Sequence, residues 1–402
     1  MERLPEDPPE EIFAPRIEPG MSNQEVLVRP FGRSFPEPAM VDVMPQQNAT
    51  VAYKIDHTQA IINLDHHAPG WGSVFFGIRL RRADEGHFEE PDPADEECRV
   101  AIKRLSKAVV DAYLALGGEE NPYKEVHRMQ NLGDDQHVLG CLDVLEDNTS
   151  KDAGFLYIIS KKCTPLVSMR HRPEHEWDLD ENSYRPIFQR MINRYVENVF
   201  FSGCLCMYIH AHVLNRCFSP LSLAYLHEHN ICHADIKPAN FMVIRHPGYV
   251  LLNDLAMSFQ MPEGGLVNRR PRGPFGTYAY MPWEVYQNAG PFDAEGRDLW
   301  ACLVTLFNLI TGLPVYQLPV VEDILFRYKI MAQALGVAPD NPRAMEVLQE
   351  HPRLQNIRLV LVGLSPQLRE LFENVFHFDY SRRWTIDDVR NCAWFRGPPY
   401  PP

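Results

Sequence analysis

The sequence contains little cysteine and lacks a long uninterrupted apolar run. Nine cysteines are scattered over 402 residues, and this sparse, odd-numbered set does not indicate the disulfide framework of a small secreted protein. Cys204 and Cys206 form a lone C-x-C pair, without the second pair that a structural zinc site needs. The most apolar stretch, residues 299–316, includes Asn308 and Gly312. Its leucines recur at helical spacing, which indicates a buried helix rather than a membrane span.

Basic residues are fewer than acidic residues. The chain has 39 Lys and Arg against 53 Asp and Glu, a formal net charge of −14, which excludes nucleic-acid binding through an overall positive charge. The first residues lack the basic start and apolar stretch of a signal peptide, so we expect a cytoplasmic protein with reduced thiols. Apolar residues make up 45% and charged residues 23%, which is typical of a globular protein and unlike a disordered or collagen-like chain.

Proline, in contrast, is abundant and is concentrated near the start of the chain. Nine of the 34 prolines fall in the first 45 residues, among many acidic side chains, so residues 1–50 are predicted to form an extension that is partly disordered. Residues 397–402 are predicted to be a short tail. Residues 84–97 contain eight acidic and no basic residues, which indicates a solvated loop between two strands.

Hydrophobic periodicity predicts strands in the first part of the chain. Alternating or continuously apolar runs indicate strands at residues 72–80, 99–105 and 155–160. Between the second and third of these, residues 123–132 predict a helix with Val126, Met129 and Leu132 on one face.

After about residue 180, helical patterns dominate, with one exception. Two short apolar runs at 241–244 and 249–252 flank a His-Pro-Gly turn and predict a β-hairpin. Ser365 followed by Pro366 is a favourable helix start. The helix that follows is expected to turn four apolar residues inward, namely Leu368, Leu371, Phe372 and Val375. A sheet-rich part followed by a larger helical part predicts an α+β fold with two lobes.

The most informative stretch is residues 233–240, which read His-Ala-Asp-Ile-Lys-Pro-Ala-Asn. Asp235, Lys237 and Asn240 bring a carboxylate, an ammonium and a carboxamide together, a set that can orient a hydroxyl, neutralise a phosphate and bind a metal. Asp254 comes just after the second strand of the predicted hairpin. Asn240 and Asp254 therefore bracket that hairpin and can converge on one ion, for which such hard oxygen ligands suit Mg²⁺.

Residues 233–240 resemble the catalytic loop of eukaryotic protein kinases, usually H-R-D-x-K-P-x-N in the Ser/Thr branch. Further segments resemble other kinase motifs and follow one another in the family's order. They are residues 100–103 (V-A-I-K), Glu125, residues 254–256 (D-L-A), residues 276–284, residues 298–300 and Arg383. Because several short motifs follow one another in the expected order, the chain is identified as a member of this family.

The resemblance covers residues 55–396 and implies a bilobal α+β protein kinase fold. Its N-lobe, about residues 55–163, would contain an antiparallel sheet and one helix. Its C-lobe, about residues 164–396, would be mainly helical. Insertions are expected at about 81–98 and 171–217.

The resemblance also implies ATP and Mg²⁺ as cofactors and a protein with a Ser or Thr acceptor as substrate. Lys103 would hold the α- and β-phosphates of ATP, and Glu125 would orient it. Gly70, Gly72 and Val74 occupy the last part of the Gly-rich loop, which covers the phosphates in the family.

The remaining catalytic roles fall on the second half of the chain. By resemblance, Asp235 would accept or orient the proton of the substrate hydroxyl, and Lys237 would steady the transferred phosphoryl group. Asn240 and Asp254 would hold Mg²⁺ and with it the nucleotide. Lys237 and Thr277 favour Ser/Thr over Tyr substrates.

Three further residues are expected to be structural: Glu284, Asp298 and Arg383. In the family, the arginine at the position of Arg383 pairs with the glutamate at the position of Glu284. Neither a nucleic-acid partner nor a membrane span is expected, and the oligomeric state is not indicated.

Two departures from the family pattern leave the activity open. His67 and Pro69 stand where the first two glycines of the Gly-rich loop are usual, and proline has no N–H to offer a phosphate. Residues 254–256 lack the Phe and Gly of D-F-G. The alternative to an active enzyme is therefore a pseudokinase that acts as a nucleotide-binding scaffold or allosteric regulator. Phosphorylation of a small molecule on the same fold is a third interpretation.

A third departure concerns regulation. Ala234 replaces the arginine of H-R-D, which in the family commonly binds a phosphate on the activation loop, so we expect a loop that needs no such phosphate. Arg269, Arg270 and Arg272 lie in that loop. They could bind an acidic substrate, fold onto the acidic residues 84–97, or be solvated.

Overall fold

The computed structural model divides the chain into two compact units. It describes residues 26–29, 39–40, 51–56, 62–64, 69–82, 88–92, 95–132, 137–147, 154–165, 222–244, 249–268, 273–288, 290–311, 315–320, 323 and 364–396. One unit, called the N-unit, comprises Met1–Gly133 and Gly140–Lys162, and the other, the C-unit, comprises Asp134–Leu139 and Cys163–Pro402. The predicted insertion at 171–217, the tail at 397–402, His67 and the three arginines at 269–272 lie outside the described residues.

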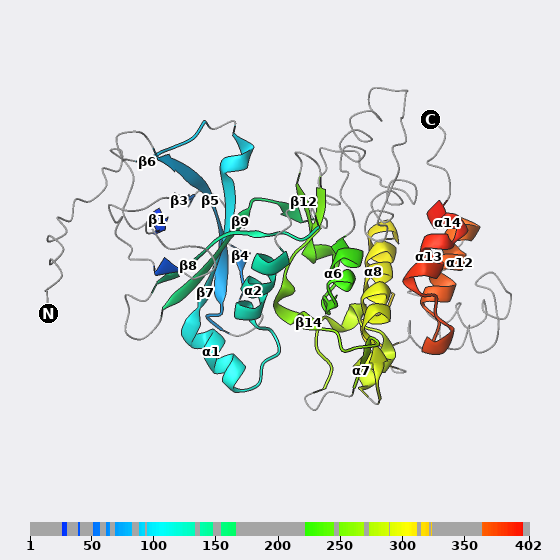
Figure 1. Ribbon diagram of the computed structural model, residues 1–402. Helices are drawn as coiled ribbons and strands as arrows, with labels where there is room; N and C mark the ends of the chain where they lie inside the picture. The colour runs from blue at the N-terminus through cyan, green and yellow to red at the C-terminus, as the bar shows by residue number, and fades with distance from the viewer. Residues whose placement is uncertain are drawn as a thin grey trace, which may run out of the picture. The chain divides into compact units, whose positions relative to one another are not determined.

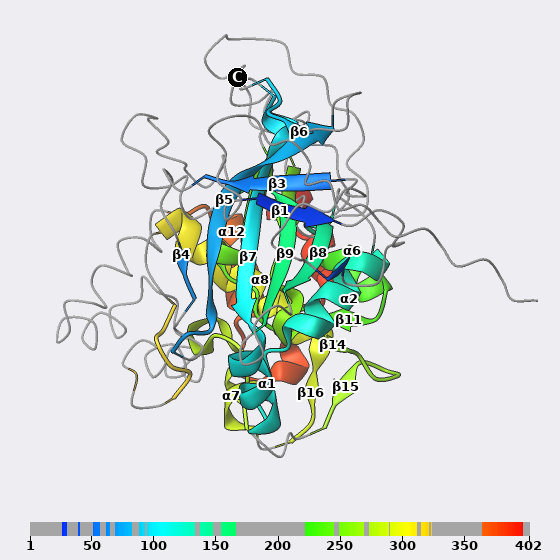
Figure 2. The ribbon, with the colours of Figure 1, turned by 90° about the vertical axis from the view of Figure 1, so that its left-hand side faces the viewer.

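A nine-stranded sheet forms the centre of the N-unit (Figures 1 and 2). Its main path runs in the order β1-β3-β5-β7-β9-β8-β2, and β4 and β6 also pair with β5. The strands are β1 Val26–Arg29, β2 Ala39–Met40, β3 Val51–Ile55, β4 Ile62–Asn63, β5 Gly72–Arg82, β6 Phe88–Glu89, β7 Arg99–Ser106, β8 Cys141–Asp147 and β9 Phe155–Lys161. All pairs are antiparallel except β2 with β8. The strands predicted at 72–80, 99–105 and 155–160 are confirmed as β5, β7 and β9.

Two of these strands come from the segment predicted to be an extension. β1 pairs with β3, placing Val26 opposite Lys54, and β2 runs parallel to β8. β3 itself begins at Val51, so pairing in the sheet starts before the predicted domain boundary at residue 55.

The acidic run at 84–97 is more than the solvated loop that was expected. β6 lies within it and pairs antiparallel with the end of β5, and a 3₁₀ helix, η2, spans Glu96–Cys98. Asp95 caps this helix by accepting a hydrogen bond from the backbone N–H of Glu97. Glu90 forms an ion pair of 2.5 Å with Lys54 of β3. Part of the acidic run is therefore tied to the sheet by pairing and by charge.

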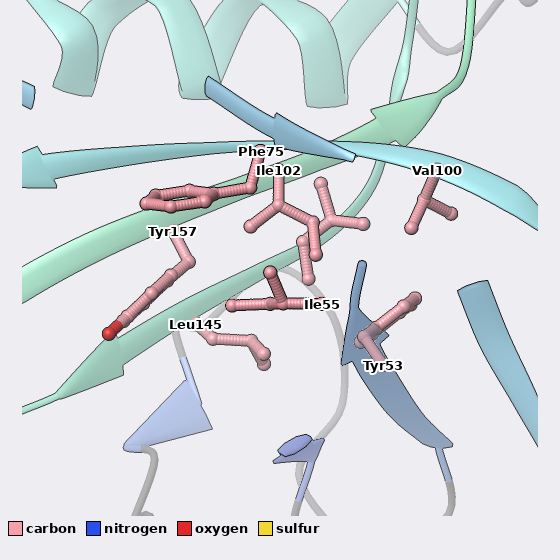
Figure 3. Packing of buried hydrophobic residues seen from close by; sticks show 8 residues of the cluster. Tyr53, Ile55, Phe75, Val100, Ile102, Leu145 and Tyr157 are labelled. Atoms are coloured by element: carbon pink, nitrogen blue, oxygen red, sulfur yellow. The ribbon is translucent and has the colours of Figure 1, made fainter. Parts of the chain in front are cut away.

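One face of the sheet carries the apolar core of the N-unit (Figure 3). Its buried members are Tyr53, Ile55, Phe75, Val100, Ile102, Leu145, Tyr157 and Ile159. Side chains alternate between the two faces of a strand, so Val100 and Ile102 of β7 enter this core. Ala101 and Lys103, which alternate with them along the strand, point to the opposite face. Lys103 is thereby directed away from the core.

Two helices accompany the sheet in the part of the N-unit that the structure describes: α1 Lys107–Ala115 and α2 Pro122–Leu132. α2 begins where Asn121 accepts hydrogen bonds from the backbone N–H groups of two residues in the first turn, and Pro122 suits the first position. Its buried face consists of Pro122, Glu125, Met129 and Leu132. The predicted helix is confirmed, but Val126 is only half-buried.

The C-unit is mainly helical. Its helices are α6 Ser222–Glu228, α7 Trp283–Gln287, α8 Ala294–Thr311, α12 Pro366–Val375, α13 Ile386–Asn391 and α14 Ala393–Arg396. Its 3₁₀ helices are η3 Pro238–Asn240, η4 Leu255–Met257, η5 Tyr278–Tyr280 and η6 Tyr380–Arg382. The described residues of this unit also form three small antiparallel sheets: β10 Thr164–Pro165 with β12 Phe241–Ile244 and β13 Tyr249–Leu252; β11 Ile231–Cys232 with β14 Phe259–Gln260; and β15 Leu266–Val267 with β16 Phe292–Asp293.

α8 is the central helix of the C-unit, drawn in yellow in Figure 1. Leu299, Leu303 and Leu306 are buried and Ile310 is half-buried, which confirms a core helix in this stretch. Among the described residues, no helix is both long enough and apolar enough to cross a membrane. The cytoplasmic location stays a prediction.

α12 and the hairpin β12–β13 also match their predictions. The Ser365 hydroxyl accepts a hydrogen bond from the backbone N–H of Leu368, and all four residues expected to face inward are buried. In the hairpin, Phe241 lies opposite Leu252. This register places the residues just outside the hairpin, Asn240 and Asn253, side by side, and the Asn253 N–H donates to the Asn240 carbonyl at 2.9 Å.

Candidate active site

Lys103 and Glu125 form an ion pair within the N-unit. The Lys103 Nζ lies 2.9 Å from Glu125 Oε2, and the Glu125 side chain is only 3% exposed. β7 directs Lys103 away from the apolar core, and Glu125 sits in the first turn of α2, where the helix dipole favours a negative charge. The structure thus brings the two residues together as predicted, while their role in holding phosphates stays a prediction.

The segment corresponding to the Gly-rich loop is fastened at its base. β4 pairs with β5, with Ile62 opposite Val74, and Val74 lies opposite Lys103 in the adjoining pair β5–β7. Gly70 has a φ of +77°, which favours glycine. At Gly72 a Cβ would overlap the carbonyl of Arg104, so a side chain at this position is excluded by the neighbouring strand.

Trp71, between these glycines, is completely buried. Its ring meets that of Tyr113 of α1 edge-on, with centroids 5.0 Å apart. The Trp71 carbonyl accepts a hydrogen bond of 2.9 Å from the N–H of Ser106. The loop is therefore anchored to α1 and to the end of β7, an arrangement that the sequence did not predict.

In the C-unit, Asp235 lies at the centre of a hydrogen-bonded group. Its Oδ1 accepts from the backbone N–H and the hydroxyl of Thr277, at 2.8 and 2.7 Å. Its Oδ2 lies 2.7 Å from the Nζ of Lys237, which also donates to the Thr277 hydroxyl at 3.1 Å. Burial alone would raise the pKa of Asp235, but the Lys237 ammonium and the Thr277 hydroxyl outweigh it and hold the pKa below its ordinary value. Asp235 is thus kept ionised and fixed in orientation.

Asp298 of α8 supports the loop that carries Asp235. Its carboxylate is completely buried and accepts from the backbone N–H groups of His233 and Ala234, at 2.7 and 2.9 Å. His227 of α6 adds a third contact at 3.1 Å. Burial by itself would raise the pKa of Asp298. The hydrogen bond and the charge of His227 act in the opposite direction and outweigh burial, so the pKa lies below its ordinary value. The structural role predicted for Asp298 agrees with this geometry.

His233 links the loop to the strand that precedes Asp254. Its Nε2 lies 3.0 Å from the Asn253 carbonyl, and its Nδ1 accepts a hydrogen bond of 3.2 Å from the backbone N–H of Asp235. Because a carbonyl can only accept and an N–H can only donate, the imidazole carries its proton on Nε2.

Asn240 and Asp254 stand at the same end of the hairpin, as predicted. The Asn240 Nδ2 donates to the Asp235 carbonyl at 2.8 Å. Asp254 adopts a left-handed conformation, with a φ of 69°. An amide oxygen and a carboxylate are hard ligands, and this donor set fits Mg²⁺. Leu255 and Ala256, which replace Phe and Gly, are buried in η4.

Glu284 and Arg383 form a bidentate ion pair. The two terminal nitrogens of Arg383 donate to the two carboxylate oxygens of Glu284 at 2.5 and 2.9 Å. The Arg383 Nε donates to the His377 carbonyl, and the guanidinium lies over the Trp300 ring. This pair ties α7 to the segment before α13, as a structural role requires.

One residue that sequence reasoning missed is Arg297, which is 3% exposed and binds the Ala234 carbonyl. The signal that the sequence offers is an arginine directly before Asp298, followed by the apolar run at residues 299–304.

The sequence matches the family model described as "Protein kinase domain" over residues 93–395. It is 24% identical over 351 residues to the Serine/threonine-protein kinase stk11 of Xenopus laevis. The aligned region covers 86% of this chain and 66% of that protein. The chain therefore spans slightly less than two thirds of that relative's length.

Two shorter matches point the same way. A segment of 105 residues, 26% of this chain, is 39% identical to 24% of the Probable serine/threonine-protein kinase CHK1 homolog of Encephalitozoon cuniculi. A segment of 176 residues, 43% of the chain, is 26% identical to 41% of the Serine/threonine-protein kinase SRK2E of Arabidopsis thaliana. The match to the kinase domain covers most of the chain, and its sheet-rich and helical units are those of the expected α+β fold, so the chain belongs to the protein kinase family.

Proposed function

We propose that this protein is an active serine/threonine kinase, which transfers the γ-phosphate of ATP to a Ser or Thr hydroxyl of a protein with the help of Mg²⁺. The observation that carries the proposal is the group formed by Asp235, Lys237 and Thr277, in which both carboxylate oxygens and the ammonium are fixed by short hydrogen bonds. The names of the relatives, all serine/threonine kinases, support the choice of acceptor.

Phosphate binding is assigned to Lys103 of the N-unit, and Mg²⁺ binding to Asn240 and Asp254 of the C-unit. Lys103, held by Glu125 at 2.9 Å, would contact the α- and β-phosphates, because an ammonium fixed by a buried carboxylate pays little further ordering cost on binding. Asn240 and Asp254 would hold Mg²⁺, which when bound neutralises charge on the phosphates.

Asp235 would orient the acceptor hydroxyl. Its ionised carboxylate can accept the hydrogen bond of an incoming O–H, and its lowered pKa makes it a weak base at neutral pH. It would therefore position the hydroxyl first and take up its proton only as the new oxygen–phosphorus bond forms. Lys237, which is about a quarter exposed, would stabilise the negative charge on the phosphoryl group in transfer.

Thr277 favours Ser and Thr substrates through its place beside Asp235. Its hydroxyl and backbone N–H both bind the carboxylate oxygen Oδ1, so the segment that carries Thr277 sets the space next to the base.

Phosphate transfer from labelled ATP to a generic protein substrate tests the proposal. We expect incorporation by the wild type and a loss of about 100-fold or more in Asp235→Asn. Asp387→Asn is the matched control, because Asp387 is 77% exposed on α13, and should keep wild-type activity. A wild type without incorporation, or an Asp235→Asn variant as active as the wild type, would contradict the proposal.

The pseudokinase is the second candidate, favoured by the Gly-rich loop. Pro69 lacks an N–H, and the buried Trp71 anchors the loop to α1. A thermal-shift titration separates the two functions. Stabilisation by ATP that requires Mg²⁺ and disappears in Asp254→Ala supports the enzyme, whereas stabilisation independent of both, without phosphate transfer, supports the scaffold.

A further inference from the structure

The middle of the activation segment, which spans residues 254–284, carries no acceptor for a phosphate. Residues 259–276 contain no Ser, Thr or Tyr, so no hydroxyl in that stretch can be phosphorylated. Ala234 stands directly before Asp235 and has no charge to bind a phosphate. Residues 259–276 therefore offer no phosphate acceptor, and the residue before Asp235 offers no basic partner. The hydroxyls that remain in the segment are those of Ser258, Thr277, Tyr278 and Tyr280.

A different arginine connects the catalytic loop to the activation segment. Arg297, near the start of α8, donates from Nη2 to the Ala234 carbonyl at 2.7 Å and to the Phe275 carbonyl. The same guanidinium lies 4.2 Å above the centroid of the Phe275 ring. One planar side chain thus contacts the residue before Asp235 and the residue two before Thr277.

The close approach of the two segments depends on Gly276. Its φ of +101° favours glycine, and a Cβ there would overlap the Ala234 carbonyl and lie 2.9 Å from Arg297 Nη2. The next residue is Thr277, whose N–H and hydroxyl bind Asp235. Arg297 therefore holds the chain two residues before Thr277, which forms the hydrogen bonds that orient the Asp235 carboxylate.

Because Arg297 is buried, losing this contact would be costly in free energy. Arg297 is 3% exposed, and a buried charge is costly unless it is hydrogen-bonded. Two carbonyls and an aromatic face supply that compensation, whereas any movement of Phe275 away from α8 would withdraw it. Two short strand pairs, β11–β14 and β15–β16, fix the earlier part of the segment in the same unit.

We infer that Arg297 is a positioning residue that holds residues 275–277 on the catalytic loop, in place of an activating phosphate. The inference rests on the proposed kinase activity for its functional consequence, but the contact itself can be tested without activity.

Hydrogen exchange and peptide kinetics of Arg297→Met test this inference. We expect the amides of residues 273–281 to exchange at least tenfold faster than in the wild type. The kcat/KM for a peptide substrate should fall at least tenfold, because a small misplacement of a catalytic group costs that much, while the affinity for ATP stays within twofold. Arg297→Lys, which keeps the charge and can donate to both carbonyls, should recover part of the loss. The control Arg390→Met, at a half-buried position of α13 where the arginine forms an ion pair with the exposed Asp387, should match the wild type in all three measurements.

Gly276→Ala provides a second route if Arg297→Met does not fold. Its added Cβ pushes the two segments apart without removing a buried charge, so the same faster exchange and the same loss of kcat/KM are expected. Wild-type exchange at residues 273–281 in a folded Arg297→Met variant would overturn the inference. If that variant does not fold, wild-type exchange in Gly276→Ala would overturn it. If the wild type transfers no phosphate, the proposed function fails, and the exchange measurement still decides the role of Arg297.

Phosphatase treatment tests the second half of the inference. Protein stripped of phosphate, as verified by mass spectrometry, should keep its full activity. A loss of activity that rephosphorylation of residues 254–284 restores would show that a phosphate, and not Arg297, orders the segment.

Discussion

Asp235 illustrates how single residues set the chemistry of the site. Its lowered pKa arises because Lys237 and Thr277 outweigh the effect of burial. A group whose pKa is lower in the folded than in the unfolded state contributes stability above the unfolded pKa, about 4 for Asp. That contribution is lost as the pH falls through the folded pKa. The same contacts that orient the carboxylate therefore also stabilise the fold at neutral pH.

Replacing Lys237 by Met should reverse this balance. Burial would then raise the pKa of Asp235, so the charged carboxylate would destabilise the fold at pH 7. We expect the free energy of unfolding to fall by roughly 3 kcal/mol there and the deficit to shrink as the pH approaches about 3, where the carboxyl is protonated. Denaturant unfolding at several pH values measures this. Lys124→Met, at an exposed position of α2, is the control, and a deficit independent of pH would contradict the explanation.

At the scale of elements, α8 holds the segments that carry the site, and α7 is tied to the last part of the C-unit. α8 supplies Asp298 to the catalytic loop and Arg297 to the activation segment, and α7 is tied to the segment before α13 by Glu284 and Arg383. These contacts join residues 63 to 99 positions apart in the chain, so they form only once the helices have packed.

A double-mutant cycle should show strong coupling between Glu284 and Arg383. The pair is bidentate and its side chains are 13% and 8% exposed, so we expect a coupling energy of about 2 kcal/mol in the free energy of unfolding. The pair Asp387–Arg390 on α13 is the matched control. It has one contact of 3.1 Å and an exposed carboxylate, and its coupling should stay below about 0.5 kcal/mol. Equal coupling in the two pairs would show that burial and bidentate geometry do not matter here.

For the whole molecule, sequence reasoning recovered the motif residues and missed the contacts between distant segments. Asp235, Lys237 and Asn240 could be predicted because they lie within six residues of each other, and α12 because capping and periodicity are local signals. Arg297 could not, since its partners are backbone carbonyls, which leave no mark in the sequence. The anchoring of Trp71 on Tyr113 likewise depends on a distant partner.

The N-terminal segment contains strands that its amino-acid composition does not indicate. Residues 1–50 are rich in proline and acids, yet they contribute β1 and β2 to the sheet of the N-unit. Short strands flanked by proline carry too weak a local signal to be recognised before the pairing partner is known.

Deleting residues 1–50 should therefore destabilise the protein. Loss of β1 exposes the edge of β3, whose Tyr53 and Ile55 belong to the buried core, and an unpaired edge favours aggregation. We expect a lower Tm and faster amide exchange in β3. Deletion of residues 1–25 leaves β1 in place and serves as the control. Identical Tm values for the two deletions would mean that β1 and β2 add no stability.

The arginine of α8 has a consequence for how the proposed kinase activity would be controlled in a cell. A side chain is present from the moment of translation, whereas a phosphate has to be added by another enzyme and can be removed again. With Arg297 in this role, phosphate-transfer capacity would arise as soon as the polypeptide folds, and no upstream signal could turn it on. Control would then pass to synthesis, degradation and encounter with substrate, and the amount of protein, rather than its modification state, would set the output.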